Sequence, residues 1–286
     1  MIRLSNGHSF EFMTASGALA FDGRGWPWEW PLRWFGLLDP ALFTIVIKTV
    51  TRHPRRGNLR WSHPWSVVKK IGVDGAVNAI GLTNPGIDRW RQEVAPKIPH
   101  DYNLIVSLEA DNSQELGEML KQVEGLSLRG VELNLSCPNS TAGRGADTEK
   151  IVSLCAGAKK RTRLPLIAKL SVTHDYVTIA KRLEGTVEAI AINSIPWKVI
   201  YPDRRSPLER FGDGGVSGRV VQSFTWKMVK ELSIASSIPV IGPSVWEFQD
   251  IQKIFDLGAR AVSFGSIFLR YPWRPTLYVR RWKRKK

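Results

Sequence analysis

The chain contains the stretch VELNLSCPN at residues 131–139, which combines a strand with a polar, reactive turn. Apolar residues at 131, 133 and 135 alternate with Glu132 and Asn134, the period of two that is typical of a strand. Pro138 has no backbone N–H to donate, so we expect the strand to end near Cys137. A thiol at a strand exit is either a base or nucleophile, or a small packed residue, and this stretch alone leaves both interpretations open.

Seven further short apolar runs have the character of strands. They cover residues 10–15, 43–47, 104–108, 166–170, 189–194, 239–242 and 261–266. Helical patterns occupy residues 113–124, 147–160, 220–232 and 246–257, between or after these runs. Residues 78–86 and 212–218 are rich in turn formers, and we expect both to be loops. Eight strands with helix-length spacers predict an α/β fold, a single-domain (β/α)8 TIM barrel.

Composition limits the class of protein. The 286 residues are 43% hydrophobic and 23% charged, as in an ordinary soluble globule. The sequence has no apolar run long enough to span a bilayer, and its start lacks the pattern of a signal peptide. Cys137 and Cys155 give no disulfide framework, so we expect a cytoplasmic protein. Cys155 lies among apolar residues of a predicted helix, and we expect it to be a core residue.

The net charge of +15 is concentrated at the C-terminus. Eight Lys or Arg residues and no acid occur in residues 270–286. We therefore divide the chain into a barrel at 1–269 and a basic aromatic tail at 270–286. The tail suits an anionic membrane, a nucleic acid or an acidic partner, although a solvated, frayed terminus is the interpretation that we favour. Four tryptophans between residues 26 and 34 pack on the barrel exterior or form an apolar patch for a partner.

Polar residues recur at the strand exits, where a barrel of this type has its site. Carboxamides offer paired donors and acceptors that suit a planar amide or imide ring. Lysines at the ends of buried strands suit an anionic or electron-rich cofactor. No His, Asp or Glu cluster has the spacing of metal ligands. The polar and glycine positions at the exits are Ser16, Lys48, Asn134, Cys137, Asn139, Lys169, Asn193, Ser194, Gly242, Gly265 and Ser266.

With these motifs, the chain from about Met13 to Ser266 resembles the dihydroorotate dehydrogenase family. The resemblance includes ASG at 15–17, KT at 48–49, NAIGLTNPG at 78–86, GGVSG at 214–218 and GS at 265–266. It implies a barrel that binds FMN and oxidises dihydroorotate to orotate in pyrimidine biosynthesis. A Cys at position 137 resembles the class 1 enzymes. Residues 78–82 resemble the subclass that pairs with an FAD and iron–sulfur subunit to reduce NAD, and a homodimer is the implied assembly.

The resemblance also implies a role for each matching residue. Cys137 would remove the proton from C5 of dihydroorotate. The residues implied to hold the substrate are Asn78, Ile80, Gly81, Leu82, Asn134, Asn139, Asn193 and Ser194. The residues implied to hold FMN are Ala15, Ser16, Gly17, Lys48, Thr49, Asn134, Lys169, Ile192, Gly218, Gly242, Gly265 and Ser266.

One departure from the family pattern concerns the cofactor phosphate. Gly242 is followed by Pro243, which has no amide hydrogen to give a phosphate, and the glycine run is one residue short. We therefore expect weaker or rearranged phosphate binding. Two alternatives to the main interpretation are a tRNA-dihydrouridine synthase-like flavoenzyme and a non-catalytic barrel that docks through its basic tail. The electron acceptor is left open between NAD through a partner subunit, fumarate and a quinone.

Overall fold

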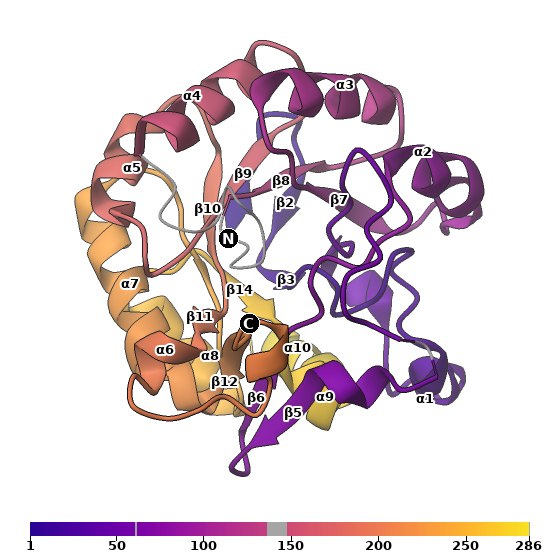
Figure 1. Cartoon of the computed structure of the whole chain (residues 1–286), viewed down its shortest axis with the longest axis vertical. Coiled ribbons are helices and arrows are strands. Elements are labelled where there is room, and N and C mark those ends of the chain that lie inside the picture. The colour runs from indigo at the N-terminus through magenta and orange to yellow at the C-terminus, as the bar shows by residue number, and fades with distance from the viewer. Residues whose placement is uncertain (61, 136–147, 286) are drawn as a thin grey trace.

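A computed structural model describes residues 1–60, 62–135 and 148–285, and it confirms the predicted barrel. Eight parallel strands form one sheet in the order β10-β9-β8-β7-β4-β3-β14-β13. A parallel bridge between Ile190 and Val240 joins the two edge strands, so the sheet closes on itself (Figure 1). The strands are β3 (Phe12–Thr14), β4 (Thr44–Val46), β7 (Asn103–Leu108), β8 (Gly130–Asn134), β9 (Leu166–Leu170), β10 (Ala189–Ile192), β13 (Ile241–Gly242) and β14 (Ala261–Phe264).

Helices surround this sheet, with α3, α4, α5 and α7 in a continuous arc (Figure 1). The apolar residues of α3 at 116, 119, 120 and 123 recur at helical spacing and are buried against the strands. Asn112 caps this helix by accepting from the Glu115 N–H. The helices before the C-terminal region are α1 (Trp30–Trp34), α2 (Ile87–Arg89), α3 (Ser113–Val123), α4 (Thr148–Lys159), α5 (Tyr176–Arg182), α6 (Trp197–Ile200), α7 (Gln222–Ala235) and α8 (Phe248–Asp256).

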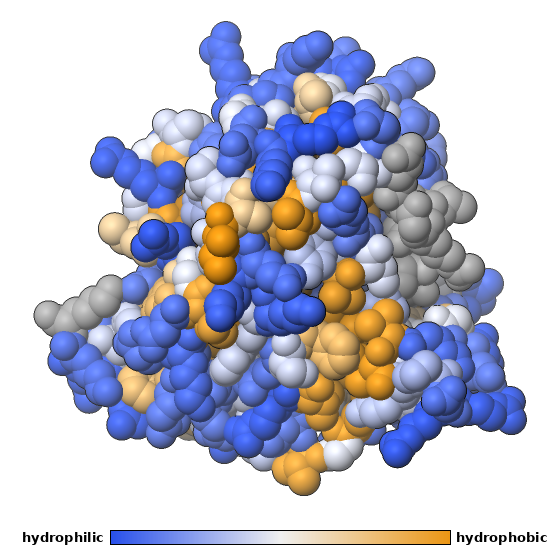
Figure 2. Space-filling view, turned by 90° about the vertical axis from the view of Figure 1, so that its left-hand side faces the viewer, coloured by the Kyte–Doolittle hydropathy of each residue, from blue (hydrophilic) through white to orange (hydrophobic). Residues whose placement is uncertain are grey.

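Shorter helical turns lie in the connections between these elements. A π-helical segment covers Trp90–Val94. The 3-10 turns are Pro27–Glu29, Pro40–Leu42, Pro64–Val67, Ala95–Lys97, Glu209–Phe211 and Arg219–Val221. In the described ranges, no helix combines the length and apolar character needed to cross a bilayer. The side of the molecule that carries α5 and α7 is mainly hydrophilic, with small hydrophobic groups between its polar side chains (Figure 2).

Cys155 occupies the core position that the sequence predicts for it. It lies in α4 and is fully buried. Burial raises the pKa of its thiol to about 12, so the thiolate is suppressed at neutral pH. Cys155 is therefore a packing residue.

An N-terminal hairpin closes one end of the barrel. Strands β1 (Ile2–Arg3) and β2 (Ser9–Phe10) pair antiparallel directly before β3. Ile2 and Phe10 join one buried cluster with inward-facing residues such as Met13 and Ile167. Among the described residues, apolar side chains fill the amino end of the barrel, so that end offers no entrance to a ligand.

A second, antiparallel sheet is formed by segments that lie between barrel strands in the sequence, and it was not predicted. Its order is β11-β12-β6-β5, formed by Ile195–Pro196, Gly215–Gly218, Gly75–Asn78 and Val68–Ile71. The loop predicted at 212–218 is therefore wrong for its second half, and the loop predicted at 78–86 begins on the last residue of a strand. The glycines of β12 have a low strand propensity, so the sequence did not predict this strand. At Gly215, however, a Cβ atom would lie 2.4 Å from Ser194 Oγ, so close packing explains the residue.

The C-terminal residues complete the barrel. Helices α9 (Ile267–Arg270) and α10 (Arg274–Lys283) follow β14. Val279 is fully buried, and the Trp282 ring lies 6.3 Å from the Phe12 ring and 5.5 Å from the Phe255 ring. The frayed terminus that we favoured is therefore wrong for residues 274–283. The many arginines and lysines made the amphipathic pattern of this helix hard to recognise. Its apolar stripe faces the barrel, and its basic residues do not.

Candidate active site

A cavity of about 310 Å³ opens among the carboxyl ends of the barrel strands and the second sheet. Most of the residues that the sequence singled out line it, although they come from distant parts of the chain. The predicted residues found there are Ala15, Ser16, Gly17, Lys48, Thr49, Asn78, Ile80, Gly81, Leu82, Asn134, Lys169, Ile192, Asn193, Ser194, Gly218, Gly265 and Ser266.

Three predicted residues do not join this set. Cys137 and Asn139 lie outside the described residues, so their roles stay predictions. Gly242 is not part of the cavity lining. A Cβ atom on Gly242 would lie 2.3 Å from Ile254 Cγ1, so this glycine serves the packing of β13 against α8. Pro243, Ser244 and the residue that follows line the cavity in its place.

A buried ion pair lies at the base of the cavity. Lys169 Nζ donates to Glu132 Oε1 at 2.7 Å, and Ser107 Oγ donates to the same oxygen at 2.8 Å. Lys169 is 8% exposed and Glu132 is 1% exposed. A buried charge is tolerated when it is paired and hydrogen-bonded, so each side chain holds the other in place. Glu132 was missed as a site residue, although its alternation with Asn134 already put both on one face of the strand.

Asn134 presents an unsatisfied acceptor at the cavity. Its Nδ2 donates to Glu109 Oε2 at 3.0 Å, which fixes the orientation of the carboxamide. Its Oδ1 is buried and has no hydrogen-bond partner among the described residues. A buried acceptor of this kind carries a desolvation cost that a ligand N–H can remove. Arg55 lies 3.6 Å from Glu109, which extends the network to the basic loop after β4.

A second lysine lies at the exit of a strand that β8 and β7 separate from the strand of Lys169. Lys48 follows β4 and is 7% exposed, and its Nζ lies 5.6 Å from the centroid of the Phe21 ring. Thr49 N–H donates to Ser16 Oγ at 3.1 Å, which holds the exits of β3 and β4 together. Gly17 has a φ of +81°, and a Cβ there would lie 3.2 Å from Lys48 Cγ. The glycine therefore lets the turn after β3 pass close over the lysine stem.

Small residues and hydroxyl groups line another part of the cavity. Gly218 has a φ of +101°, and a Cβ there would lie 2.4 Å from Asp74 O, so only glycine fits. Thr225 Oγ1 donates to Ser244 Oγ at 3.2 Å, and both residues line the cavity. Ser244 has a φ of +64°, which is unusual for a residue other than glycine. Thr225 was not predicted as a site residue because it lies inside a predicted helix.

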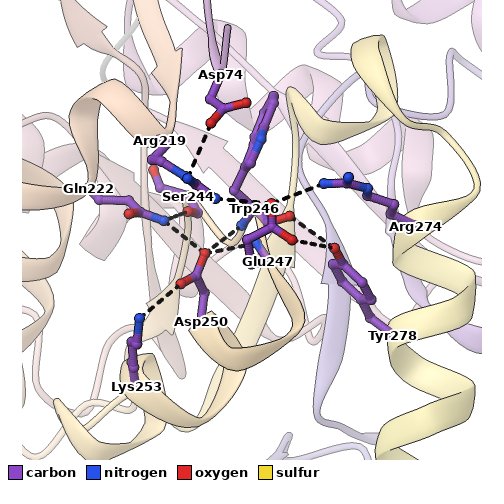
Figure 3. A network of polar contacts seen from close by, with 10 residues as sticks. All are labelled: Asp74, Arg219, Gln222, Ser244, Trp246, Glu247, Asp250, Lys253, Arg274 and Tyr278. Atoms are coloured by element: carbon purple, nitrogen blue, oxygen red, sulfur yellow. Dashed lines mark hydrogen bonds and ion pairs between the residues drawn. The ribbon is translucent and has the colours of Figure 1, made fainter.

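A polar network holds the loop that carries Ser244 (Figure 3). Gln222 Nε2 donates to Ser244 O at 2.8 Å and to Asp250 Oδ2 at 3.0 Å. The same Asp250 oxygen accepts from the backbone N–H groups of Trp246 and Glu247. Asp250 therefore caps the start of α8 and occupies two amides that follow the shortened glycine run.

Glu247 links this loop to the C-terminal helix (Figure 3). Its carboxylate lies 3.0 Å from Arg219 Nη2 and 3.2 Å from Arg274 Nη1. Tyr278 OH donates to Glu247 Oε2 at 3.4 Å. Burial, followed by the nearby Glu247 charge, raises the pKa of Tyr278 to about 12, so this hydroxyl keeps its proton. Residues of α10 therefore support the cavity wall, which the sequence-based picture of a free tail did not foresee.

Tryptophans form one rim of the cavity. Trp26 is buried, and its ring stacks on that of Trp28 with centroids 5.5 Å apart and planes 3° apart. Trp28 contacts Trp65 at 5.6 Å between centroids. Trp26 Nε1 donates to Gly17 O at 3.2 Å, which ties this rim to the turn after β3. The high number of tryptophans was visible in the sequence, but it did not predict that they line the cavity.

Comparison of the sequence with known proteins identifies relatives of this chain. A family model described as dihydroorotate dehydrogenase matches residues 36–273. The chain is 32% identical to a protein of Desulforudis audaxviator named dihydroorotate dehydrogenase B (NAD(+)), catalytic subunit, over 91% of this chain and 83% of that protein. It is also 32% identical to a dihydroorotate dehydrogenase A (fumarate) of Lactobacillus delbrueckii subsp. bulgaricus, over 79% of this chain and 75% of the relative. The chain therefore belongs to the dihydroorotate dehydrogenase family.

Proposed function

We propose that this protein is an FMN-dependent dihydroorotate dehydrogenase, an oxidoreductase that acts on a CH–CH bond in pyrimidine biosynthesis. The observation that carries the proposal is the meeting of Lys48, Asn134, Lys169 and Asn193 in one cavity, from the exits of four different barrel strands. Family membership supports the same activity. It also favours this reading over the alternative of a tRNA-dihydrouridine synthase-like enzyme.

The lining of the cavity fits a flavin mononucleotide. The two buried lysines provide cationic groups for an electron-accepting ring system. Close-packed glycines at 218 and 265, with the hydroxyls of Thr225, Ser244 and Ser266, provide a small and polar wall for a phosphate. The positive charge of Lys169 is balanced by Glu132. A ligand phosphate would therefore be bound by hydroxyl and amide donors, and not by a fixed cation.

The residues of the chain then have distinct tasks. Bound FMN would supply the hydride acceptor for C6 of dihydroorotate. Cys137 removes the proton at C5, as the family resemblance implies. Asn134 is held by Glu109 and offers its unpartnered Oδ1 to an N–H of the pyrimidine ring. Asn78, Asn193 and Ser194 complete the contacts with the ring and its carboxylate, while the second sheet limits access of water.

Formation of orotate tests the proposal. Purified protein loaded with FMN should convert dihydroorotate to orotate when a soluble dye accepts the electrons. Asn134→Ala should lower kcat/KM by about 10- to 100-fold, because one substrate hydrogen bond in a buried site is lost. Asn6→Ala is the matched control, since Asn6 lies on the surface, where it donates to the Arg129 carbonyl and accepts from the His8 N–H. FMN-loaded protein that forms no orotate would contradict the proposal.

Finer aspects of the function stay predictions. We propose that electrons leave through a partner subunit that carries FAD and an iron–sulfur cluster, and relatives named catalytic subunits support a partner of some kind. Fumarate is the alternative electron acceptor, because one relative is named for it. The homodimer and the cytoplasmic setting are part of the same proposal. Copurification of the chain with an iron-containing subunit would support the proposed partner subunit. Direct reduction of fumarate would oppose it.

A further inference from the structure

Large hydrophobic side chains are exposed in two segments that meet. In the first segment, Trp34 and Phe35 are each 78% exposed, Trp30 is 43% exposed and Leu37 is 39% exposed. Trp30 and Trp34 are four residues apart on α1, so they lie on one face of that short helix. Side chains exposed to this degree project from the surface, and Figure 1 shows α1 at the outer edge of the molecule.

The second segment belongs to α10 and its N-cap. Trp273 is 38% exposed and Leu277 is 45% exposed, and Arg280 follows them at helical spacing. Arg280 Nη1 donates to Gly36 O at 2.9 Å, and its Nη2 lies 3.1 Å from Asp39 Oδ2. These contacts place the exposed stripe of α10 beside the residues that follow α1. The two segments form one surface, which we call the docking face, made of Trp30, Trp34, Phe35, Leu37, Trp273 and Leu277.

Positive charge is concentrated in the C-terminal segment that carries one half of the docking face. Residues 270–285 contain seven Lys or Arg side chains and no acid. Arg270 and Arg284 are exposed at the two ends of this segment. Lys69 and Lys70 are exposed on β5, a few residues after Trp65 at the rim of the cavity. Exposed aromatic side chains beside a cluster of cations are typical of proteins that lie in the headgroup region of a membrane.

We propose that the docking face binds the surface of an anionic lipid bilayer. A second copy of the chain is disfavoured as the occupant, because a twofold contact uses the same surface on both copies and would bring two basic faces together. A rigid acidic protein would need pockets that match the projecting Trp34 and Phe35, whereas a fluid headgroup layer accepts them without a matching shape. Trp65 and Leu269, which line the cavity, are also exposed, so the cavity rim lies on the same aromatic side of the protein.

Vesicle sedimentation with the full chain tests this proposal without any flavin chemistry. The protein should sediment with vesicles of phosphatidylcholine and phosphatidylglycerol, remain in the supernatant with phosphatidylcholine alone, and dissociate at high salt. The double variant Trp34→Ser/Phe35→Ser should bind about tenfold more weakly or worse. Phe224→Ser/Ile234→Ser is the matched control, because these exposed side chains lie on α7, away from the docking face.

A charge variant tests the second component. Arg270→Glu/Arg284→Glu should weaken binding to anionic vesicles by about tenfold, whereas Lys121→Glu/Lys160→Glu, with the same change in net charge, should not. Orotate formation with a soluble dye should be unchanged in all four variants, so a failure of the proposed activity is recognised separately. Wild-type protein that ignores anionic vesicles would overturn the proposal. A dimer or a protein complex that is lost in Trp34→Ser/Phe35→Ser, without vesicle binding, would overturn it in favour of a protein interface.

Discussion

Lys169 Nζ lies 2.7 Å from Glu132 Oε1 inside the barrel, where both residues are buried. The residues come from β9 and β8, which are neighbours in the sheet. Ser107, from β7 on the other side of β8, donates to the same carboxylate. Three adjacent strands thus fix one cation and its counter-ion at the base of the cavity.

Loss of the cation should destabilise the whole barrel. Lys169→Ala leaves the Glu132 carboxylate buried without its partner, so the free energy of unfolding should fall by about 3–5 kcal/mol. Urea denaturation measures this change. Lys169→Met/Glu132→Gln removes both charges and should be more stable than the single variant. A single variant as stable as the wild type would show that the pair does not hold the strands.

The hydroxyl pair near the proposed phosphate site should control how long FMN is retained. Thr225→Val/Ser244→Ala removes two hydroxyl groups that line the cavity, and FMN should dissociate about tenfold faster as one or two hydrogen bonds are lost. Fluorescence of the released flavin on dilution gives the rate. Thr178→Val, on the exposed side of α5, is the control. An unchanged rate would mean that the phosphate lies elsewhere in the cavity.

Glu247 should affect FMN retention through the loop that it holds. Glu247→Gln weakens the contacts with Arg219 and Arg274, so dissociation of FMN should become about fivefold faster. The melting temperature should change little, because partly exposed ion pairs each contribute about 1 kcal/mol or less. Glu93→Gln breaks a comparable exposed pair with Arg89 and serves as the control. Equal rates of FMN dissociation from the two variants would show that the contacts of α10 with Glu247 do not affect cofactor binding.

The stability of the protein should depend on pH through Glu29. Burial raises the pKa of this carboxyl to about 7, although the Trp26 N–H opposes the shift. Between the ordinary pKa of 4.5 and about 7, the folded protein keeps a proton that the unfolded chain releases. The contribution of Glu29 is therefore complete below pH 4.5 and is lost as the pH rises through 7, a difference of about 3 kcal/mol.

Denaturation of wild-type protein and Glu29→Gln at several pH values measures this effect. Glutamine can still accept from the Trp26 N–H but does not titrate, so the variant should lose the decline between pH 4.5 and 7. At pH 8 it should be at least as stable as the wild type. Parallel curves for the two proteins would show that Glu29 keeps an ordinary pKa.

Residues at strand exits explain why much of the site could be predicted from the sequence. A buried strand followed by a polar residue is visible as a pattern, and the barrel brings every such exit to one end. Lys48, Asn134, Lys169 and Asn193 were found in this way. Glu132 was hidden because its partner Lys169 is 37 residues away in the sequence, and a buried ion pair is a property of the packed sheet.

Other elements could not be predicted because tertiary contacts override local preference. Strand β12 has glycine at two of its four positions and is held as a strand by its pairing with β6. Helix α10 carries so much charge that its apolar stripe at Tyr278, Val279 and Trp282 was overlooked. Ser244 adopts a left-handed backbone conformation, which a serine in the sequence does not predict. In each case the local sequence was compatible with the structure but did not require it.

The most direct test of the central claim is the visible spectrum of the FMN-loaded protein before and after anaerobic addition of dihydroorotate. We predict that the flavin absorbance bleaches within the mixing time of a manual experiment and that Asn134→Ala bleaches more slowly. A bound flavin whose spectrum does not change with dihydroorotate would contradict the assignment of this cavity as a dihydroorotate site.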